Sequence, residues 1–411
     1  MAMTGTENER TANALTVRPF RLLWLNNIPF FLVVNAQRFA FGWIVLDVLL
    51  RDEGAQGLVA FTLGIPTALV VLQAGVWADR HDRRRLLIGT QLASATVMAG
   101  TALLIRSDHI EMGWVIIATL LAGTASAVGQ PVRSALVPAL VGRDQLFGAI
   151  ALNAIAMTLS LILGPVLVKV VGDRFGFEGA FWFQAGLLVF GTVFLLLLEV
   201  PTHEEERDRR SVVAEVRDAV HHILDDSQLK TLFGLLLTGS LTVNPAVMVT
   251  LQAHVKSELG RDAGDAAIPF AVMGIGIAIS SLFLMRKGDM ANKGAVFQRA
   301  MIVGGTMTLL IGFANSFAVV VGLSLVMGLA GGFFINMNQG LIQARTPQPL
   351  MGRVMAVYTL VAQGLFPIGA LILGLLATAI GTGTAISLAA TFSLGIVITT
   401  YVRNAELRRL A

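Results

Sequence analysis

The chain has 411 residues, of which 55% are apolar and only 14% are charged, whereas a soluble domain carries about 25% charged residues. A net charge of +4 gives no reason to expect a nucleic-acid partner, and the absence of cysteine excludes disulfides, thiolate metal sites and thiol nucleophiles. Apolar runs of about 20 residues, the length that crosses about 30 Å of hydrocarbon as a helix, recur along the chain. The composition therefore predicts a polytopic α-helical membrane protein.

The chain opens with a polar segment, residues 1–17, which lacks the apolar core of a cleavable signal peptide. We therefore expect the first apolar run to remain in the mature protein. We predict an all-α membrane protein with twelve transmembrane helices, in the ranges 22–49, 57–78, 86–105, 112–136, 146–171, 180–198, 229–255, 266–285, 295–313, 317–341, 351–379 and 382–402.

The longest polar stretch, residues 199–230, divides these spans into two sets of six. Within it, Val213, Val216, Val220 and Leu224 recur at helical spacing, which indicates an amphipathic helix on the membrane surface. The sequence therefore predicts an N-terminal six-helix half over 1–199, a cytoplasmic linker with an amphipathic helix over 200–228, and a C-terminal six-helix half over 229–411.

The placement of lysine and arginine predicts the orientation. With both termini in the cytoplasm, most of the 30 basic residues lie in cytoplasmic segments, and few, such as Arg51, Arg106 and Lys169, lie outside. Cytoplasmic loops of membrane proteins carry such an excess of positive charge. We therefore predict a multi-pass protein of the cytoplasmic (inner) membrane with both termini cytoplasmic.

A densely charged loop, residues 75–85, follows the second span and reads GVWADRHDRRR. So many charges cannot lie in hydrocarbon, so the loop is predicted at the membrane surface. Together with twelve spans in two halves, it resembles the major facilitator superfamily, whose signature there is Gly-x-x-x-Asp-Arg-x-Gly-Arg-Arg. Asp82 replaces the second glycine of this signature. The matching positions are Gly75, Asp79, Arg80, Arg83 and Arg84.

Other segments resemble the drug-efflux branch of the superfamily, which includes macrolide pumps and the enterobactin exporter. The resemblance covers nearly the whole chain and implies two pseudo-symmetric six-helix halves around a midplane cavity that opens alternately to each side. The segments are FRLLW at 20–24, QPVRSALVP at 130–138, ALN at 151–153, GP at 164–165 and GRVMAVY at 352–358.

The resemblance also implies gating roles for the loop. Gly75 would allow close approach of the second and eleventh spans, and Asp79 would face the N-terminus of the eleventh span, where a helix dipole favours negative charge. Arg80 and Arg83 would hold neighbouring helix ends, so that together these residues stabilise the outward-facing state. In the alternative, the arginines only enforce topology. Arg133 stands near the end of the fourth span, where the family often has a carboxylate.

Polar residues recur on one face of the first, fourth, seventh and tenth spans. Such side chains at bilayer depth face the bundle interior or a wet cavity, and a spacing of three or four places each set on a single helix face. In the superfamily these four helices line the central cavity, so we predict substrate contacts; the alternative is hydrogen bonding between helices. The predicted substrate-binding residues are Asn35, Arg38, Gln130, Asn244, Gln252, Asn336 and Gln339.

Arg38 differs from the others because it lies well inside the first span, with no acid three or four positions away. A buried arginine needs a partner, such as Asp47, a backbone carbonyl or an anionic group on the substrate. A structural role and substrate contact both stay open for this residue.

Few residues are available for energy coupling. Proton antiport, which the resemblance implies, needs a group whose pKa changes with access. Asp47 and His254, near the outer ends of the first and seventh spans, are the candidate proton carriers. The chain has no Gly-x-x-x-x-Gly-Lys-Ser/Thr loop, so ATP is not expected as the direct energy source. The histidines show no metal spacing, and we expect no cofactor.

We predict a secondary active transporter that exports amphipathic, drug-like small molecules by proton antiport with alternating access, as a monomer in membrane lipid. The alternative within transport is an endogenous siderophore or lipid-like metabolite. A membrane-embedded enzyme would need a nucleophile, base or metal cluster at one depth, and the sequence shows none. A non-transporting sensor, the alternative from another class, would be expected to add a soluble output domain.

Overall fold

The computed structural model describes residues 14–80, 82–142, 145–200, 212–287, 290 and 292–410, without the side chains of 71–80, 147 and 212–215. All regular elements in these ranges are helical, which confirms the predicted all-α class. They are α2 (Arg18–Trp43), η1 (Ile44–Val48), α3 (Glu53–Arg80), α4 (Arg83–Arg106), α5 (Met112–Leu140), α6 (Leu146–Leu196), α7 (Val212–Asp225), α8 (Ser227–Leu241), α9 (Val243–Pro245), η3 (Ala246–Thr250), α10 (Leu251–Ser257), η4 (Ala263–Ala266), α11 (Ala267–Lys287), α12 (Lys293–Gly312), α13 (Phe317–Arg345), η5 (Gln348–Leu350), α14 (Met351–Thr359), η6 (Leu360–Gly364), α15 (Phe366–Ile380), α16 (Thr382–Arg403) and α17 (Ala405–Arg409).

The number of long apolar helices agrees with the prediction. Among the described residues, 10 helical segments are long and apolar enough to cross a membrane. One of them, over Gly148–Leu196, bends at Gly176, whose φ of 74° lies outside the helical region and is open to glycine without strain. Counting its two arms separately and adding the 28-residue α3 gives the twelve predicted spans.

Contacts divide the chain into two units. Unit 1 comprises Met1–Phe41 and Leu69–Arg209, and unit 2 comprises Gly42–Ala68 and Arg210–Ala411. The sequence analysis placed the division at the linker, and it did not anticipate that the end of α2 and the first part of α3 would belong to unit 2. The charge cluster of the linker, residues 204–210, lies outside the described residues.

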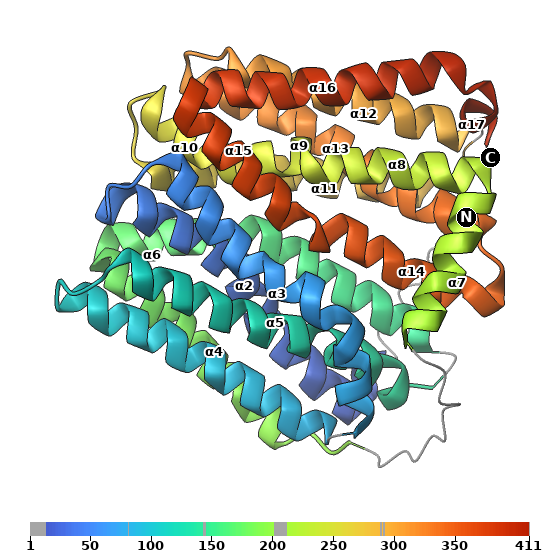
Figure 1. Ribbon diagram of the computed structural model, residues 1–411. Helices are drawn as coiled ribbons and strands as arrows, with labels where there is room; N and C mark the ends of the chain where they lie inside the picture. Colours follow the sequence, from blue (N-terminus) through green and yellow to red (C-terminus); the bar gives the residue numbers. More distant parts are fainter. Residues whose placement is uncertain are drawn as a thin grey trace. The chain divides into compact units, whose positions relative to one another are not determined.

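In unit 1, α4 packs along both α5 and α6 (Figure 1). An apolar core lies where α4 begins and where α6 ends. Phe20, Leu87, Leu136 and Leu195 are fully buried in it, with further leucines and alanines around them. Because this core joins residues from four helices, it fixes the positions of the helix ends near the charged loop.

In unit 2, α13 packs against α11 and α12, and α12 packs against α16 (Figure 1). The seam between α11 and α13 is made by small residues. A Cβ atom at Gly328 would lie 2.0 Å from the carbonyl oxygen of Met273, and one at Gly276 would lie 2.6 Å from that of Leu325. Small residues allow helix backbones to approach closely in lipid, where dispersion contacts rather than water exclusion hold helices together.

The helix expected in the linker is present as α7, and it packs against α8 and α14. Its inward face carries Ala219 and Ile223, which are buried, and Val216, which packs against the same core. Val220 and Leu224 are exposed on the other side. The apolar residues of α7 therefore divide between a face that packs against other helices of unit 2 and an exposed face.

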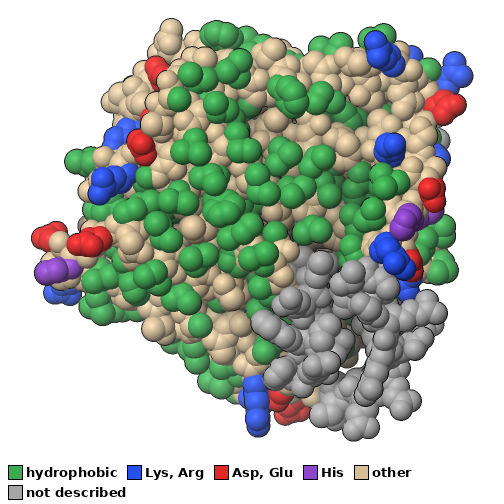
Figure 2. Space-filling model, in the orientation of Figure 1, with side chains coloured by type: hydrophobic (Ala, Val, Ile, Leu, Met, Phe, Trp, Pro, Cys, Tyr) green, Lys and Arg blue, Asp and Glu red, His purple; other side chains and the backbone are tan. Residues whose placement is uncertain are grey.

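The surface of the helices is apolar over most of their length. Large exposed side chains include Ile155 and Leu163 on α6, Ile279 on α11 and Leu388 on α16. On the visible face, hydrophobic side chains cover the middle of the helices, and charged side chains lie near the helix ends (Figure 2). This is the pattern of a protein whose helices contact lipid.

Candidate functional site

The loop between α3 and α4 contains the predicted gating residues. The side chains of Gly75, Asp79 and Arg80 lie outside the described residues, so their predicted roles stay predictions. The side chain of Arg83, the first residue of α4, is half-buried. The structure therefore describes the second part of the loop only.

That second part has a capping function. Asp82, which replaces a glycine of the family signature, is the N-cap of α4, and its Oδ1 accepts hydrogen bonds from the backbone N–H groups of Arg84 and Arg85 at 2.9 and 3.2 Å. The guanidinium of Arg84 donates to the carbonyl oxygens of Leu195, at 2.8 Å, and Leu196 at the end of α6. Arg84 thus holds the end of α6.

In unit 1, the buried arginine is Arg133 on α5, which is 2% exposed. Its Nη1 donates to the Oδ1 atoms of Asn26 and of Asn27, the latter at 2.8 Å, and its Nη2 donates to Oε1 of Gln91 at 2.6 Å. The guanidinium also lies 3.8 Å from the ring centre of Phe30. Three helices, α2, α4 and α5, therefore meet at one cation.

A pocket of about 140 Å³ lies beside this cation, and we refer to it as the Arg133 pocket. Asn27 links the cation to the far wall, because its Nδ2 donates to Oδ1 of Asn153 on α6 at 3.0 Å. The residues that line the Arg133 pocket include Asn27, Phe31, Gln130, Asn153 and Met157.

The three substrate-binding residues predicted in unit 1 do not share one site. Gln130 lines the Arg133 pocket. The amide nitrogen of Asn35 donates to the carbonyl oxygen of Phe31, one turn earlier, at 3.0 Å. Arg38 lies on α2 with part of its side-chain surface accessible, so its structural or substrate-binding role stays a prediction.

In unit 2, Asp47 lies in the π-helical turn η1, where it accepts from three groups. Its Oδ1 lies 2.7 Å from Nζ of Lys256 on α10, and its Oδ2 accepts from Nε1 of Trp43 at 2.8 Å and from the backbone N–H of Ala263 at 3.0 Å. Lys256 also donates to the carbonyl oxygen of Leu46. The candidate proton carrier is thus ion-paired and half-buried.

A second contact holds the same segment to α10. Gln252, a predicted substrate-binding residue, is 2% exposed, and its Oε1 accepts from Nε2 of Gln56 on α3 at 2.9 Å. The backbone N–H of Gly54 donates to Oγ1 of Thr378 on α15 at 2.8 Å. This hydrogen bond of Gln252 joins two helices, which is the packing alternative considered for the polar residues.

The other predicted substrate-binding residues of unit 2 are more accessible. Asn244 on α9 is exposed, and Gln339 on α13 is half-buried. Asn336 is also exposed, but its amide donates to the carbonyl oxygen of Gly332 at 2.7 Å and to Oγ of Ser281 on α11 at 3.0 Å. Asn336 therefore helps to join α13 to α11, and only its carbonyl oxygen stays open to a ligand.

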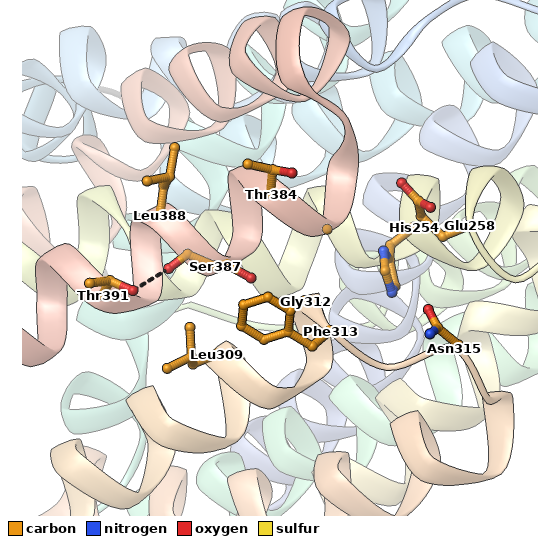
Figure 3. Close-up of a pocket in the computed structure, with 11 residues that line it drawn as sticks. His254, Glu258, Leu309, Gly312, Phe313, Asn315, Thr384, Ser387, Leu388 and Thr391 are labelled. Atoms are coloured by element: carbon orange, nitrogen blue, oxygen red, sulfur yellow. Dashed lines mark hydrogen bonds between the residues drawn. The ribbon is translucent and has the colours of Figure 1, made fainter.

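His254, the other candidate proton carrier, lines a pocket of about 410 Å³ between α10, α12 and α16 (Figure 3). The ring is 1% exposed, and its Nδ1 lies 3.1 Å from Oγ1 of Thr382. The same hydroxyl lies 3.4 Å from Oε1 of Glu258. His254 and Glu258 occupy one end of the pocket, and residues of α16, such as Ser387, and of the end of α12, such as Leu309, line the rest. A hydroxyl thus connects a buried imidazole to a carboxylate.

Sequence reasoning missed the partners that organise these sites. Gln91 and Asn26 bind Arg133, and Lys256 binds Asp47, but none of the three was predicted as a site residue. The available signal was the presence of polar and basic residues in otherwise apolar spans. That signal identifies candidates, whereas partners depend on which helices are neighbours.

Solved transporter structures share the architecture described above. The POT family transporter PepTSo superposes with a TM-score of 0.76 at 12% identity, covering 95% of this chain and 99% of that one. The nucleoside transporter NupG gives 0.72 at 14% identity, with the same coverage. The chain therefore has the same fold as these two proteins, which is in keeping with the predicted all-α architecture.

A model of the transmembrane secretion effector family matches residues 11–409, so the chain belongs to this family of the major facilitator superfamily. The multidrug efflux pump Tap of Mycobacterium tuberculosis (strain ATCC 25618 / H37Rv) is 26% identical over 361 residues, which are 83% of each chain. Macrolide efflux protein A of Streptococcus pyogenes is 23% identical over 358 residues, 84% of this chain and 86% of that one. These findings confirm the predicted resemblance to efflux proteins, and the protein is a multi-pass membrane protein.

Proposed function

We propose that the protein exports amphipathic, drug-like small molecules across the cytoplasmic membrane by proton antiport with alternating access. It acts as a monomer, with both termini in the cytoplasm. The family match and the relatives named as multidrug and macrolide efflux proteins support export. The excess of basic residues in the predicted cytoplasmic segments supports the orientation.

The observation that carries the mechanism is the membership of residues 42–68 in unit 2. α2 and α3 begin or end in unit 1, yet the segment that joins them is held to α10 and α15 by Asp47, Gln56 and Gly54. In a transporter that works by rocking of two halves, contacts of this kind must form in one state and break in the other. Forming and breaking these contacts would distinguish the two states between which alternating access proceeds.

The Asp47–Lys256 ion pair provides a route for proton coupling. Nζ of Lys256 lies 2.7 Å from the carboxylate of Asp47, so departure of the segment from α10 would break this ion pair. We infer that Asp47 carries the proton, because its ion pair would open and close with the movement of the segment.

Transport measurements on everted membrane vesicles test the function. We expect vesicles that contain the protein to accumulate members of a panel of neutral and cationic amphipathic dyes when a pH gradient is imposed, and to stop when the gradient is collapsed. Vesicles from cells without the protein are the control. Uptake that does not depend on the pH gradient would exclude proton antiport. Failure to take up any member of the panel would exclude drug export.

A further inference from the structure

The side chain of Arg133 carries a buried positive charge whose hydrogen-bond acceptors in the described part of the chain are side-chain amides. Its hydrogen-bond acceptors are the oxygens of Asn26, Asn27 and Gln91, and Phe30 lies against its face. No carboxylate forms an ion pair with it among the residues that the structure describes. Amide oxygens satisfy donors, but they do not neutralise the charge. A cation left in this state inside a membrane protein is costly and is typical of a functional site.

The guanidinium still has donors to offer. It has five N–H groups, and three acceptors take up the two on Nη1 and one on Nη2. The Nε atom of Arg133 is buried and has no hydrogen-bond partner in the described part of the chain. Arg133 itself lines the Arg133 pocket, so unused hydrogen-bonding capacity and uncompensated charge occur at one cavity.

The shape and lining of the pocket limit what can occupy it. Its volume of about 140 Å³ corresponds to four or five water molecules, at about 30 Å³ each, which is enough for a carboxylate or phosphate group. Gln130 and Asn153 place polar side chains near the cation, and Phe31 and the exposed Met157 extend an apolar wall from it. An occupant with an anionic head and an apolar body matches both parts.

We propose that the Arg133 pocket binds the anionic group, a carboxylate or a phosphodiester, of an amphipathic ligand whose apolar part lies along Phe31 and Met157. This inference rests on the proposed function, because it names anionic amphiphiles as a substrate class of the exporter. The guanidinium supplies charge-assisted hydrogen bonds, which are stronger than those between neutral groups and favour planar oxyanions.

The competing explanation is that Arg133 only ties α2, α4 and α5 together. The two explanations differ in their response to a carboxylate placed inside the pocket. Asn153→Asp keeps the acceptor oxygen that Asn27 uses and adds a negative charge on the pocket wall. If Arg133 only joins the three helices, this change should leave ligand binding unchanged. If the pocket binds anions, the new carboxylate competes with the ligand.

The probes are a matched pair, 1-pyrenebutyrate and 1-pyrenebutanol, which differ in the anionic group. Their dissociation constants are measured by quenching of tryptophan fluorescence on the full chain in phosphatidylcholine nanodiscs. We expect the wild type to bind pyrenebutyrate at least about tenfold more tightly than pyrenebutanol. Asn153→Asp and Gln130→Glu should remove this preference by weakening the binding of pyrenebutyrate more than that of pyrenebutanol. Gln145→Glu, at the N-terminal end of α6 outside the pocket, is the control for added charge and should keep the preference.

Two further arms separate the possible outcomes. Nanodiscs with phosphatidylglycerol weaken pyrenebutyrate binding if a lipid headgroup occupies the pocket, and leave it unchanged if the occupant is a free amphipathic acid. Export of Nile red, a neutral dye, into everted vesicles tests the proposed function independently. Dye export without an anion preference in the wild type would overturn the inference and leave the function standing. A preference that survives both Asn153→Asp and Gln130→Glu would also overturn it, since the anion would then bind elsewhere.

Discussion

Single residues in this protein act through partners that are far away in the sequence. Asp47 shows this most clearly, because its two oxygens bind Lys256, Trp43 and the backbone of Ala263. These contacts hold the segment that carries Asp47 to α10 and to the backbone at Ala263. The ion pair of Asp47 with Lys256 therefore depends on the position of the segment that carries Asp47.

Replacement of this carboxylate tests its coupling role. We expect Asp47→Asn to abolish accumulation driven by a pH gradient, because the amide cannot take up a proton, and to leave downhill substrate exchange intact. Both are measured in everted vesicles at matched expression. Asp173→Asn, which removes the acid of the more exposed Lys169–Asp173 pair, should transport normally. Full pH-driven transport in Asp47→Asn would exclude this residue and direct attention to His254.

Arg84 gives a second prediction at this scale. Its guanidinium donates to the carbonyl oxygens of Leu195 and Leu196 in the last turn of α6, where helix carbonyl groups lack the regular backbone partners of the helix interior. We expect Arg84→Gln to lower the free energy of unfolding by about 1–3 kcal/mol, the usual worth of hydrogen bonds from a charged donor.

Arg85→Gln is the matched control, measured beside Arg84→Gln by thermal unfolding of the purified protein. The Arg85–Asp82 pair has 88% and 51% of its side-chain surfaces exposed, so its loss should be nearly neutral. Equal stability of the two variants would show that the capping of α6 contributes nothing.

At the scale of helices, close approach between backbones decides which elements pack. The α11–α13 seam depends on Gly276 and Gly328, where any Cβ atom would meet backbone of the other helix. The π-helical turns η1 and η3 occur in the first span of each half, and η1 carries Asp47. Such turns interrupt the regular hydrogen-bond pattern and are frequent at functional sites.

The seam can be tested with a single methyl group. Gly328→Ala places a Cβ atom 2.0 Å from the carbonyl oxygen of Met273, so the helices must separate. We expect a loss of about 1–3 kcal/mol in the free energy of unfolding, measured in detergent. Gly322→Ala, on the same helix with nothing within 4 Å, should be neutral or stabilising by up to about 1 kcal/mol. Similar losses in both variants would rule out the seam as the cause.

The junction of α8 with α13 gives a prediction about pH. Burial raises the pKa of Asp226, the N-cap of α8. Hydrogen bonds from the backbone N–H groups of Leu229 and Gln228 and from the side chain of Arg345 lower the pKa by more than burial raises it, so it lies below its ordinary value. The unfolded chain has an aspartate pKa of about 3.9. The stabilisation is therefore present above about pH 4 and is lost as the pH falls from there through the lowered pKa.

Thermal unfolding of the wild type and Asp226→Asn at several pH values measures this effect. Wild type should be the more stable protein at pH 7, and the difference should shrink below pH 4. Asp218→Asn, which removes the acid of the longer 3.6 Å contact with Arg353, should show a smaller dependence. A difference that does not vary with pH would mean that the charge of Asp226 does not contribute to stability.

At the scale of the whole molecule, residues 42–68 matter most, because they continue helices of unit 1 and pack within unit 2. Alternating access requires that this packing be reversible. The protein has no cysteine, so a pair can be introduced without removing native thiols. Gly54 and Thr378 suit a disulfide, because a Cβ atom at Gly54 would lie 3.1 Å from the Thr378 hydroxyl oxygen, the position a sulfur would take.

We expect the double variant Gly54→Cys/Thr378→Cys to lose transport on oxidation and to regain it on reduction, since the disulfide prevents the segment from leaving α15. Transport is measured in vesicles, and the extent of cross-linking in the same sample is measured by gel mobility after proteolysis. Gly54→Cys alone, treated with the same oxidant, should keep its transport. Full transport by a completely cross-linked protein would show that this packing does not open during the cycle.

The amino-acid sequence by itself determined the class, the twelve spans and the superfamily of this protein. Those properties depend on the lengths of apolar runs and on a short charged motif, both of which are local in the chain. Helical spacing also indicated which faces of the helices are polar. It correctly placed Asp47 and His254 near helix ends, but it could not show what they contact.

Only the tertiary structure decided the partners and the grouping. Arg133 is a buried cation held by three amides, Arg84 caps α6, and Lys256 pairs with Asp47. Likewise, residues 42–68 belong to unit 2 rather than to the half in which they are encoded. The physical reason is that periodicity sets the direction of a side chain around its own helix. The rotation and neighbours of that helix are set by packing between segments distant in sequence.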